Sequence, residues 1–437
     1  MTRLSSWWYR TRESFWFVPL ICLVSALVLA QGMVTLDRAI PYDLSSPWFA
    51  WVYGVGIDGS RAMLGAIGTS MLAVAATAFS ITISVVVTAS ATYGPRLVGN
   101  FMADRGNQIV LGVLVATFVY ALMVLRTIRS EADDQMSFVP HLAVNLAVLM
   151  AVADAVLLVW FIHHIAASVR VETLAHGVRT NLRSVVERMH PQEAPEDVVE
   201  SNALLSGGQV VDAGSVGYLV EVDFHRLRTV AREADAVLKV IPRVGDHILA
   251  SEPLVRLWPS AAADDEDTAE KLRDCVRIGD SRSVFQDVRF AEQQVLELAV
   301  RALSPGTNDP YTAVNAIEEV AAGVALAVSR ARPGNTILDE QTAWVHFGTV
   351  SLEEIVDMPF DQIRPYAMDH VMVVTALMDL ASRVRRASVH PEIDERMNKQ
   401  VEVLVATFRA TEPPPHDMAR VEEHLALSSG AAVTEAR

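Results

Sequence analysis

The chain has 437 residues, of which 51% are hydrophobic and only 20% charged, and its formal net charge at pH 7 is −16. This composition excludes a disordered chain, a small secreted disulfide scaffold and a basic nucleic-acid-binding protein. Residues 1–169 are neutral, with nine arginines and nine acidic residues, so residues 170–437 carry all of the negative excess. An apolar, neutral front followed by an acidic back predicts an α-helical membrane protein with a water-exposed C-terminal domain.

Four apolar stretches are long enough to cross a bilayer, which takes about 20 residues. They cover residues 15–36, 62–92, 109–125 and 139–165. We therefore expect a four-helix transmembrane bundle within residues 1–168. The first stretch is longer than the roughly 7–15 apolar residues of a signal peptide, which favours an uncleaved helix.

The arginines predict how these spans are oriented. The N-terminal tail, the loop between the second and third spans and the segment after the fourth span hold eight arginines, against four on the other side. Positive charge is retained in the cytoplasm. We therefore expect a multi-pass protein of the bacterial cytoplasmic (inner) membrane, with both termini in the cytoplasm and the lipid bilayer as its first partner.

The second span carries small and hydroxylated residues at steps of three or four, which places them on one face of a helix. We call these residues a stripe: Thr69, Ala73, Thr77, Ser80, Ser84 and Thr88. Small residues let helices approach closely, so one interpretation is helix packing. The other is a hydroxyl-lined path for ions, formed when several copies place the stripe on a common axis.

The fourth span contains one carboxylate, Asp154, near its middle. A charge at that depth is costly, so the side chain must face protein or water and find a partner. The functional interpretation is a proton or cation site. The structural alternative is an aspartate hydrogen-bonded to hydroxyls of the second span, to Asn145 or to Tyr120.

The region after the fourth span divides into four parts. Residues 169–206 are predicted to extend the helix and then form a linker, and residues 207–260 a β-rich module that resembles small barrels of the lipoyl type without their lysine. Residues 271–410 have mainly helical patterns, and residues 411–437, which begin with a proline run, are expected to be disordered. The fold class is therefore a helical membrane bundle followed by an α+β domain.

The segment SPGTNDP is predicted to join two helices of the C-terminal domain. Gly306 can supply a left-handed end to the first, and Asp309 an N-cap to the second. Alternatively, an anion or nucleotide could bind the free amides of the new helix, with polar side chains converging around the turn. The candidate residues are Arg282, Arg289, Arg301, Asn308 and Asp309.

Few other functional signals are present. The two cysteines, Cys22 and Cys275, form no CxxC pair, and neither a metal site nor a cofactor site is predicted. No phosphate-binding loop, dinucleotide fingerprint or hydrolase motif occurs, so we expect no enzyme.

Three long strings carry a family resemblance: FSITISVVVTASATYGPRLVGNF, GYLVEVD followed by VGDHILASEPLVRLWP, and FQDVRFAEQQVLELAVRALSPGTNDPYTA. With them, the chain resembles the bacterial predicted-membrane-protein family known as domain of unknown function 2254 over nearly its whole length. The resemblance implies a cytoplasmic-membrane protein with an N-terminal helical bundle and a cytoplasmic domain. It implies no established activity and no catalytic or binding residue.

Two functions remain open at this stage. The first is a homo-oligomeric ion channel or transport-like protein with the second span lining the path and a small ion as its ligand. The second is a membrane-anchored scaffold, or a sensor of an anion or another ligand, that acts through its cytoplasmic domain. Nucleic acid is not an expected partner of either.

Overall fold

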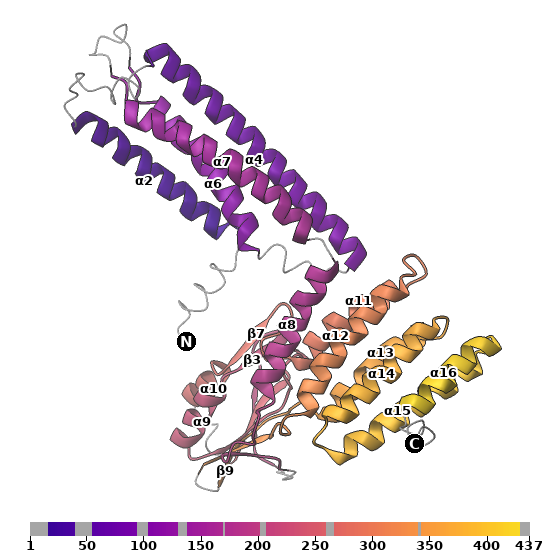
Figure 1. Cartoon of the computed structure of the whole chain (residues 1–437). Coiled ribbons are helices and arrows are strands. Elements are labelled where there is room, and N and C mark those ends of the chain that lie inside the picture. The colour runs from indigo at the N-terminus through magenta and orange to yellow at the C-terminus, as the bar shows by residue number, and fades with distance from the viewer. Residues whose placement is uncertain are drawn as a thin grey trace. The chain divides into compact units, whose positions relative to one another are not determined.

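The computed structural model describes residues 16–39, 55–93, 104–129, 138–168, 171–201, 207–258, 266–339 and 342–428. The chain folds as two compact units, Met1–Thr173 and Leu174–Arg437. Figure 1 shows both units, coloured along the chain.

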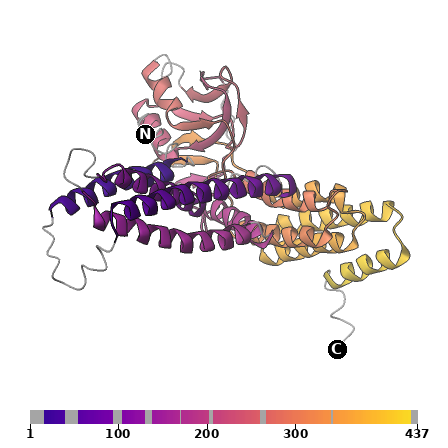
Figure 2. The ribbon, with the colours of Figure 1, turned by 90° about the horizontal axis from the view of Figure 1, so that it is seen from above.

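The N-terminal unit consists of long helices that lie side by side (Figures 1 and 2). Its described helices are α2 (Phe17–Ala39), α4 (Ile57–Tyr93), α6 (Arg105–Leu125) and α7 (His141–Ser168). Helices α6 and α7 each contact the other three, and α6 is central because it is the most buried of the four. Large aliphatic side chains such as Val28 of α2 and Val156 and Val159 of α7 are exposed on the surface of the N-terminal unit. An exposed apolar surface of this kind is expected of a protein surrounded by lipid.

Five helices in the described part of the chain are long and apolar enough to cross a membrane: these four and α12 (Pro310–Val328). Helix α12 is the least apolar of the five. It lies in the C-terminal unit and is packed against α11 (Val288–Ala302) and α14 (Val371–Ala387). The sequence analysis did not predict it as a span because its alanine-rich face is interrupted by polar residues.

The C-terminal unit contains two sheets. The larger has strand order β1-β8-β9-β4-β6-β2, and the smaller has order β5-β3-β7. Strands β4 and β9 are parallel, and all other neighbouring strands are antiparallel. The strands are β1 (Val198–Val199), β2 (Gln209–Asp212), β3 (Gly217–Val222), β4 (Val237–Val240), β5 (His247–Ile248), β6 (Pro253–Trp258), β7 (Val276–Gly279), β8 (Thr336–Asp339) and β9 (Thr342–His346).

A hydrophobic core joins these sheets to two short helices, α9 (Phe224–Glu233) and α10 (Glu266–Arg273). Asp223 caps α9 by accepting a hydrogen bond from the Arg226 backbone N–H, a bond for which aspartate is favoured at the N-cap position. Figure 2 shows the strands gathered apart from the later helices, which are coloured orange to yellow.

The β-structure differs from the predicted barrel-like module of residues 207–260. Within the described strands both sheets are open, and neither closes into a barrel. Three of the nine strands, β7, β8 and β9, follow residue 260. The lipoyl-type hairpin signal was misleading because β4 pairs with β9, a long-range partner that local patterns do not reveal.

The remaining helices form a layer of roughly aligned helices (Figure 1). Helix α11 packs against α12, and α14 packs against α13 (Leu352–Ala367), α15 (Pro391–Ala410) and α16 (Pro415–Ser428). Helix α8 (Val171–Met189) packs against α12, where Gly323 leaves room for the buried Leu182 side chain.

Helix α16 contradicts the expectation of a disordered tail over residues 411–428; residues 429–437 lie outside the described residues. The helix is held by Val421, which is buried, and by His424, whose Nε2 lies 2.9 Å from Asp379 Oδ1 of α14. The proline run suggested disorder, but a proline at the first helical position is compatible with a helix.

Candidate functional site

The stripe of small and hydroxylated residues lies on an exposed side of α4, and we call it the α4 stripe from here on. All six of its residues are exposed in the single chain. Helix α4 packs on its neighbours through a different face, formed by the buried residues Leu64, Gly68, Ala75, Ala78, Thr82 and Ala89. The helical period places this packing face roughly opposite the stripe. Packing within one chain therefore does not account for the stripe.

Three of the five stripe hydroxyls donate a hydrogen bond within their own helix. Thr77 Oγ1 donates to the Ala73 carbonyl at 3.0 Å, and Thr88 Oγ1 donates to the Ser84 carbonyl at 2.9 Å. Ser80 bonds in the same way to the carbonyl of Ala76. Back-bonded hydroxyls can face lipid, protein or water without leaving an unpaired donor. They leave oxygen lone pairs on an otherwise apolar surface.

Asp154 of α7 points into the N-terminal unit, where it is only 2% exposed. The Thr117 hydroxyl of α6 faces its carboxylate. Within the described residues, however, neither Asp154 Oδ2 nor Thr117 Oγ1 has a hydrogen bond of standard geometry. The partners expected from the sequence are engaged elsewhere: Asn145 donates to the His141 carbonyl, and Tyr120 to the Ala143 carbonyl.

A carboxylate with hydrogen-bond partners also lies at each end of the N-terminal unit. At one end, the Asp37 carboxylate of α2 accepts hydrogen bonds from the backbone N–H groups of Leu142 (3.0 Å) and Ala143 (2.9 Å) at the start of α7. At the other end, Asp104 caps α6 and lies 2.7 Å from His164 Nε2 near the end of α7. A carboxylate at a helix N-terminus is favourable. The Asp37 and Asp104 sites were not predicted, because their partners on α7 are distant in the sequence.

The five candidate residues of the SPGTNDP region divide into two groups. Arg282 and Arg289 lie near the beginning of α11, whereas Arg301, Asn308 and Asp309 lie at or beyond its end. A helix of 15 residues is about 22 Å long. The five side chains therefore do not converge on one turn.

The first group belongs to an ion-pair network between the β-structure and the helical layer. Arg282 Nε donates to Asp287 Oδ2 at 2.8 Å, and the Arg282 guanidinium lies over the Phe290 ring. Arg289 pairs with Asp246 at 3.1 Å, and Glu354 lies beside it at 3.9 Å. Burial raises the pKa of the Asp287 carboxyl, and the Arg282 charge opposes this shift. Both arginines are already neutralised by carboxylates.

The second group follows the capping interpretation. Asp309 accepts a hydrogen bond from the Thr312 backbone N–H and so occupies the start of α12 where an anion would bind. Arg301 pairs with Glu297 on its own helix. The left-handed residue of the turn is Asn308, with φ of 47°, and not Gly306. Asparagine tolerates this conformation better than other non-glycine residues.

Substitutions in this turn test the assignment. We expect Asn308→Val to destabilise the α11–α12 hairpin by about 1–2 kcal/mol, because a β-branched residue is strained at positive φ. Asn308→Gly should be nearly neutral. Gly306→Ala should also be tolerated, since a Cβ there meets no atom within 4 Å. Thermal unfolding of the three variants checks this; a large loss in Gly306→Ala would contradict it.

A further buried acid lies one turn into α11. Glu292 has no exposed surface, and neither of its carboxylate oxygens has a hydrogen-bond partner among the described residues. Complete burial raises the pKa of Glu292 well above its usual range. In the sequence, Glu292 shares a helical face with the apolar residues Val288, Val295 and Ala299. That pattern indicates a buried acid, which was not among the predicted sites.

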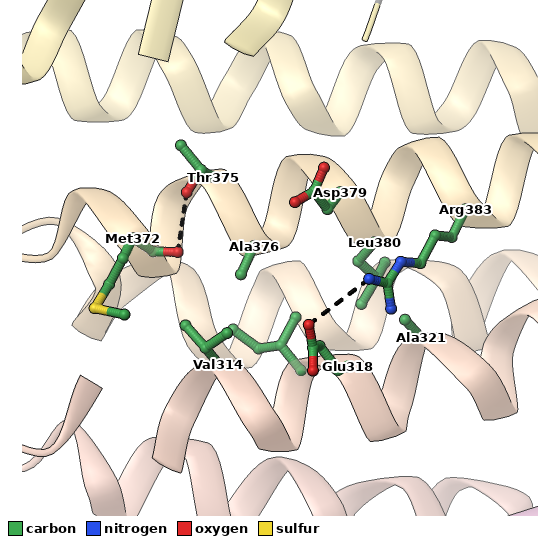
Figure 3. A pocket seen from close by; sticks show the side chains of 10 residues that line it. Val314, Glu318, Ala321, Met372, Thr375, Ala376, Asp379, Leu380 and Arg383 are labelled. Atoms are coloured by element: carbon green, nitrogen blue, oxygen red, sulfur yellow. Dashed lines mark hydrogen bonds and ion pairs between the residues drawn. The ribbon is translucent and has the colours of Figure 1, made fainter. Parts of the chain in front are cut away.

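A cavity of about 150 Å³ lies between α12 and α14 (Figure 3). Its floor is apolar, with Val314 and Leu380, and Glu318 and Arg383 approach within 3.7 Å at its edge. Sites for small molecules usually enclose about 300–1,000 Å³. The cavity is therefore too small for a ligand of ordinary size. No group of three metal-ligating side chains occurs in the described part of the chain.

An N-terminal unit of long apolar helices with aliphatic side chains on its surface, followed by an α+β unit, defines a membrane protein. The family model "Predicted membrane protein (DUF2254)" matches residues 12–382, and the chain belongs to this family. Uncharacterized proteins of Mycobacterium bovis and Mycobacterium tuberculosis are each 28% identical to it over 384 residues, covering 86% of this chain and 72% of each relative. No solved structure matches the chain.

Proposed function

We propose that the protein is a homo-oligomeric channel or transport-like protein in which α4 of several copies lines a path for small ions. The exposed α4 stripe carries this proposal. In a single chain the α4 stripe would place a column of hydroxyl oxygen atoms against lipid. The packing of α4 on its neighbours within the chain uses a different face and does not cover the stripe. A second copy, or water on an axis between copies, is a better environment for such a column.

The length of the stripe supports the same proposal. Thr69 and Thr88 are 19 residues apart, which corresponds to about 28 Å along a helix. The hydrocarbon core of a bilayer is about 30 Å thick. The stripe is therefore long enough to line a complete crossing. Helix α4, with 37 residues, has additional turns beyond this length.

The proposal includes a membrane topology. Helices α2, α4, α6 and α7 would cross a bacterial cytoplasmic membrane as a four-helix bundle, while α12 would remain an interior helix of the C-terminal unit. The distribution of arginines favours a cytoplasmic position for both termini and for the acidic C-terminal unit. That acidic surface would concentrate cations near the inner mouth of the path.

A membrane-anchored scaffold or ligand sensor has less support. Its binding site would need free cationic groups or free amides near the SPGTNDP turn. The arginines Arg282, Arg289 and Arg301 each face a carboxylate. Asp309 occupies the start of α12. The C-terminal unit is therefore better suited to assembly than to the capture of an anion.

Ion flux into proteoliposomes tests the proposal. We expect cation flux in the wild type and at least about a tenfold loss in Ser84→Leu, because a branched apolar side chain replaces a hydroxyl on the path. The matched control is Ile83→Leu, which alters the adjacent residue at the same depth, about 100° around the helix. Flux that is absent at all pH values and voltages, or equal loss in both variants, would refute conduction along the stripe.

Disulfide cross-linking tests the assembly separately. The chain has only Cys22 and Cys275, so a background with both changed to serine is accessible. We expect Ser84→Cys to form cross-linked dimers in membranes, and Ile83→Cys to form few. Cross-linking without ion flux would support the homo-oligomer and contradict the channel function.

A further inference from the structure

The polar groups inside the N-terminal unit are arranged unevenly along its length. Its interior contains two separate hydrophobic clusters. One includes Tyr120, Ala143 and Ala147, and the other includes Leu114 and Phe161. Thr117 lies between Leu114 and Tyr120 on α6, and Asp154 between Ala147 and Phe161 on α7. The Asp154–Thr117 pair therefore occupies the boundary between the two clusters.

The surroundings of the Asp154–Thr117 pair suit a proton better than a metal ion. Asp154 has no basic partner among the described ion pairs, and the Thr117 hydroxyl faces its carboxylate. Two oxygen-bearing side chains are too few for a cation such as Ca²⁺ or Mg²⁺, which takes six or more oxygen ligands. An unpaired buried carboxylate is strongly unfavourable. A neutral acid, in contrast, has an O–H that can donate to the Thr117 hydroxyl oxygen.

The surroundings of the pair differ on its two sides. Toward the end where Asp37 lies, Tyr120 follows Thr117 by one helical turn, and its hydroxyl donates to the Ala143 carbonyl at 3.0 Å. Asp37 accepts from the backbone N–H of the same Ala143. Side chains with a hydroxyl or carboxylate group, Thr117, Tyr120 and Asp37, therefore occur on the way from Asp154 to that end. Each can accept and release a proton.

Toward the other end the interior is apolar. Residues 109–116 of α6 contain no polar side chain, which is a length of about 12 Å. Residues 155–162 of α7 are also apolar apart from the Trp160 indole N–H. Polar side chains return nearer the Asp104 end, where Asn107 and Gln108 are buried and Asn107 lines a small pocket with Thr82 and Ser168. The buried Leu114 and Phe161 separate this pocket from Asp154.

We propose that Asp154 is a proton-binding site inside each chain, loaded through Thr117 and Tyr120 from the Asp37 end and closed toward the Asp104 end by the apolar cluster of Leu114 and Phe161. This proposal does not rest on the ion path along the α4 stripe, because the stripe lies on the outer face of the unit. With an ion path along the stripe, the proton bound at Asp154 would couple proton movement to ion movement.

Infrared spectroscopy of the full-length protein in proteoliposomes tests the protonation state. A protonated carboxylic acid has a C=O stretching band that a carboxylate lacks. We expect Asp154→Asn to remove one such band and Glu292→Gln another, so the two acids are assigned independently. Thr117→Val should shift the Asp154 band without removing it. An unchanged spectrum in Asp154→Asn would overturn the proposal.

Deuterium exchange tests the route. After transfer to D₂O the Asp154 band shifts as its proton is replaced, and we expect Tyr120→Phe to slow this shift about tenfold or more, since a relay group is lost. The control, Thr82→Val, removes a buried hydroxyl on the other side of the apolar cluster and should leave the rate unchanged. Slowing in Thr82→Val but not in Tyr120→Phe would overturn the route. A failure of flux or cross-linking at Ser84 would leave both infrared results unaffected.

Discussion

Glu292→Met is expected to raise the free energy of unfolding of the C-terminal unit by about 2 kcal/mol or more at pH 7. A buried polar group without a hydrogen-bond partner costs about 1–3 kcal/mol. Methionine is unbranched like glutamate and fills a similar volume without polar atoms. The substitution therefore removes an unfavourable group and leaves no large cavity.

The stabilisation should increase with pH. The folded state keeps the Glu292 proton to a higher pH than the unfolded state, because burial raises the pKa of this carboxyl. Above the unfolded pKa, about 4.3, the folded state binds more protons. The wild type therefore loses stability as the pH rises from there to the folded pKa, by up to about 1.4 kcal/mol per pH unit. Glu292→Met does not titrate, so its advantage is smallest near pH 4.

Hydrogen exchange of the α11 amides in the full-length protein, measured at several pH values in detergent, gives the required free energies. The control is Glu270→Gln, which changes an exposed acid on α10 and should alter neither the stability nor its pH dependence. A constant difference between Glu292→Met and the wild type from pH 4 to pH 8 would show that Glu292 is ionised in the folded protein.

Gly245→Ala is expected to destabilise the C-terminal unit by about 3 kcal/mol. Gly245 has φ of +94°, a conformation that costs an L-residue about 1–2 kcal/mol. In addition, a Cβ at this position would overlap the Asp287 carboxylate. That carboxylate cannot retreat without losing Arg282 and the N-cap bond to the Phe290 backbone N–H. The backbone strain at residue 245 and the loss of the Arg282–Asp287 pair therefore both lower the free energy of unfolding.

Gly207→Ala separates these two effects. Gly207 also has a positive φ, 73°, but a Cβ there meets no atom within 4 Å. We expect it to cost only the conformational term of about 1 kcal/mol. Thermal unfolding of both variants in the full-length protein measures the difference. Equal losses would show that Asp287 does not constrain the glycine.

Features determined by neighbouring residues were predicted well from the sequence. Aspartate followed by a helical pattern identified the N-cap Asp309, because the capping bond spans only three residues. Long apolar runs identified the helices α2, α4, α6 and α7, and the long strings identified the family. Each of these signals is contained within a short segment of chain.

Features that depend on distant partners were not predicted. The sequence placed the α4 stripe on one helical face. Only the structure shows that α4 packs through another face, with Ala75 and Ala78, and that the stripe is exposed in the single chain. Likewise, Glu292 is an ordinary acidic residue in the sequence. It is buried without a hydrogen-bond partner only because other helices cover it. Gly306 seemed the natural left-handed residue, yet the turn assigns that role to Asn308.

The parallel pairing of β4 with β9 has a consequence for synthesis of the chain. Leu238 pairs with Val345, about a hundred residues later, whereas β6 follows β4 almost at once. During translation β4 and β6 can pair early, but one edge of β4 stays open until His346 has left the ribosome. Open strand edges recruit other chains. A chaperone that covers this edge should therefore raise the yield of folded protein, and a ribosomal pause before residue 346 should lower it.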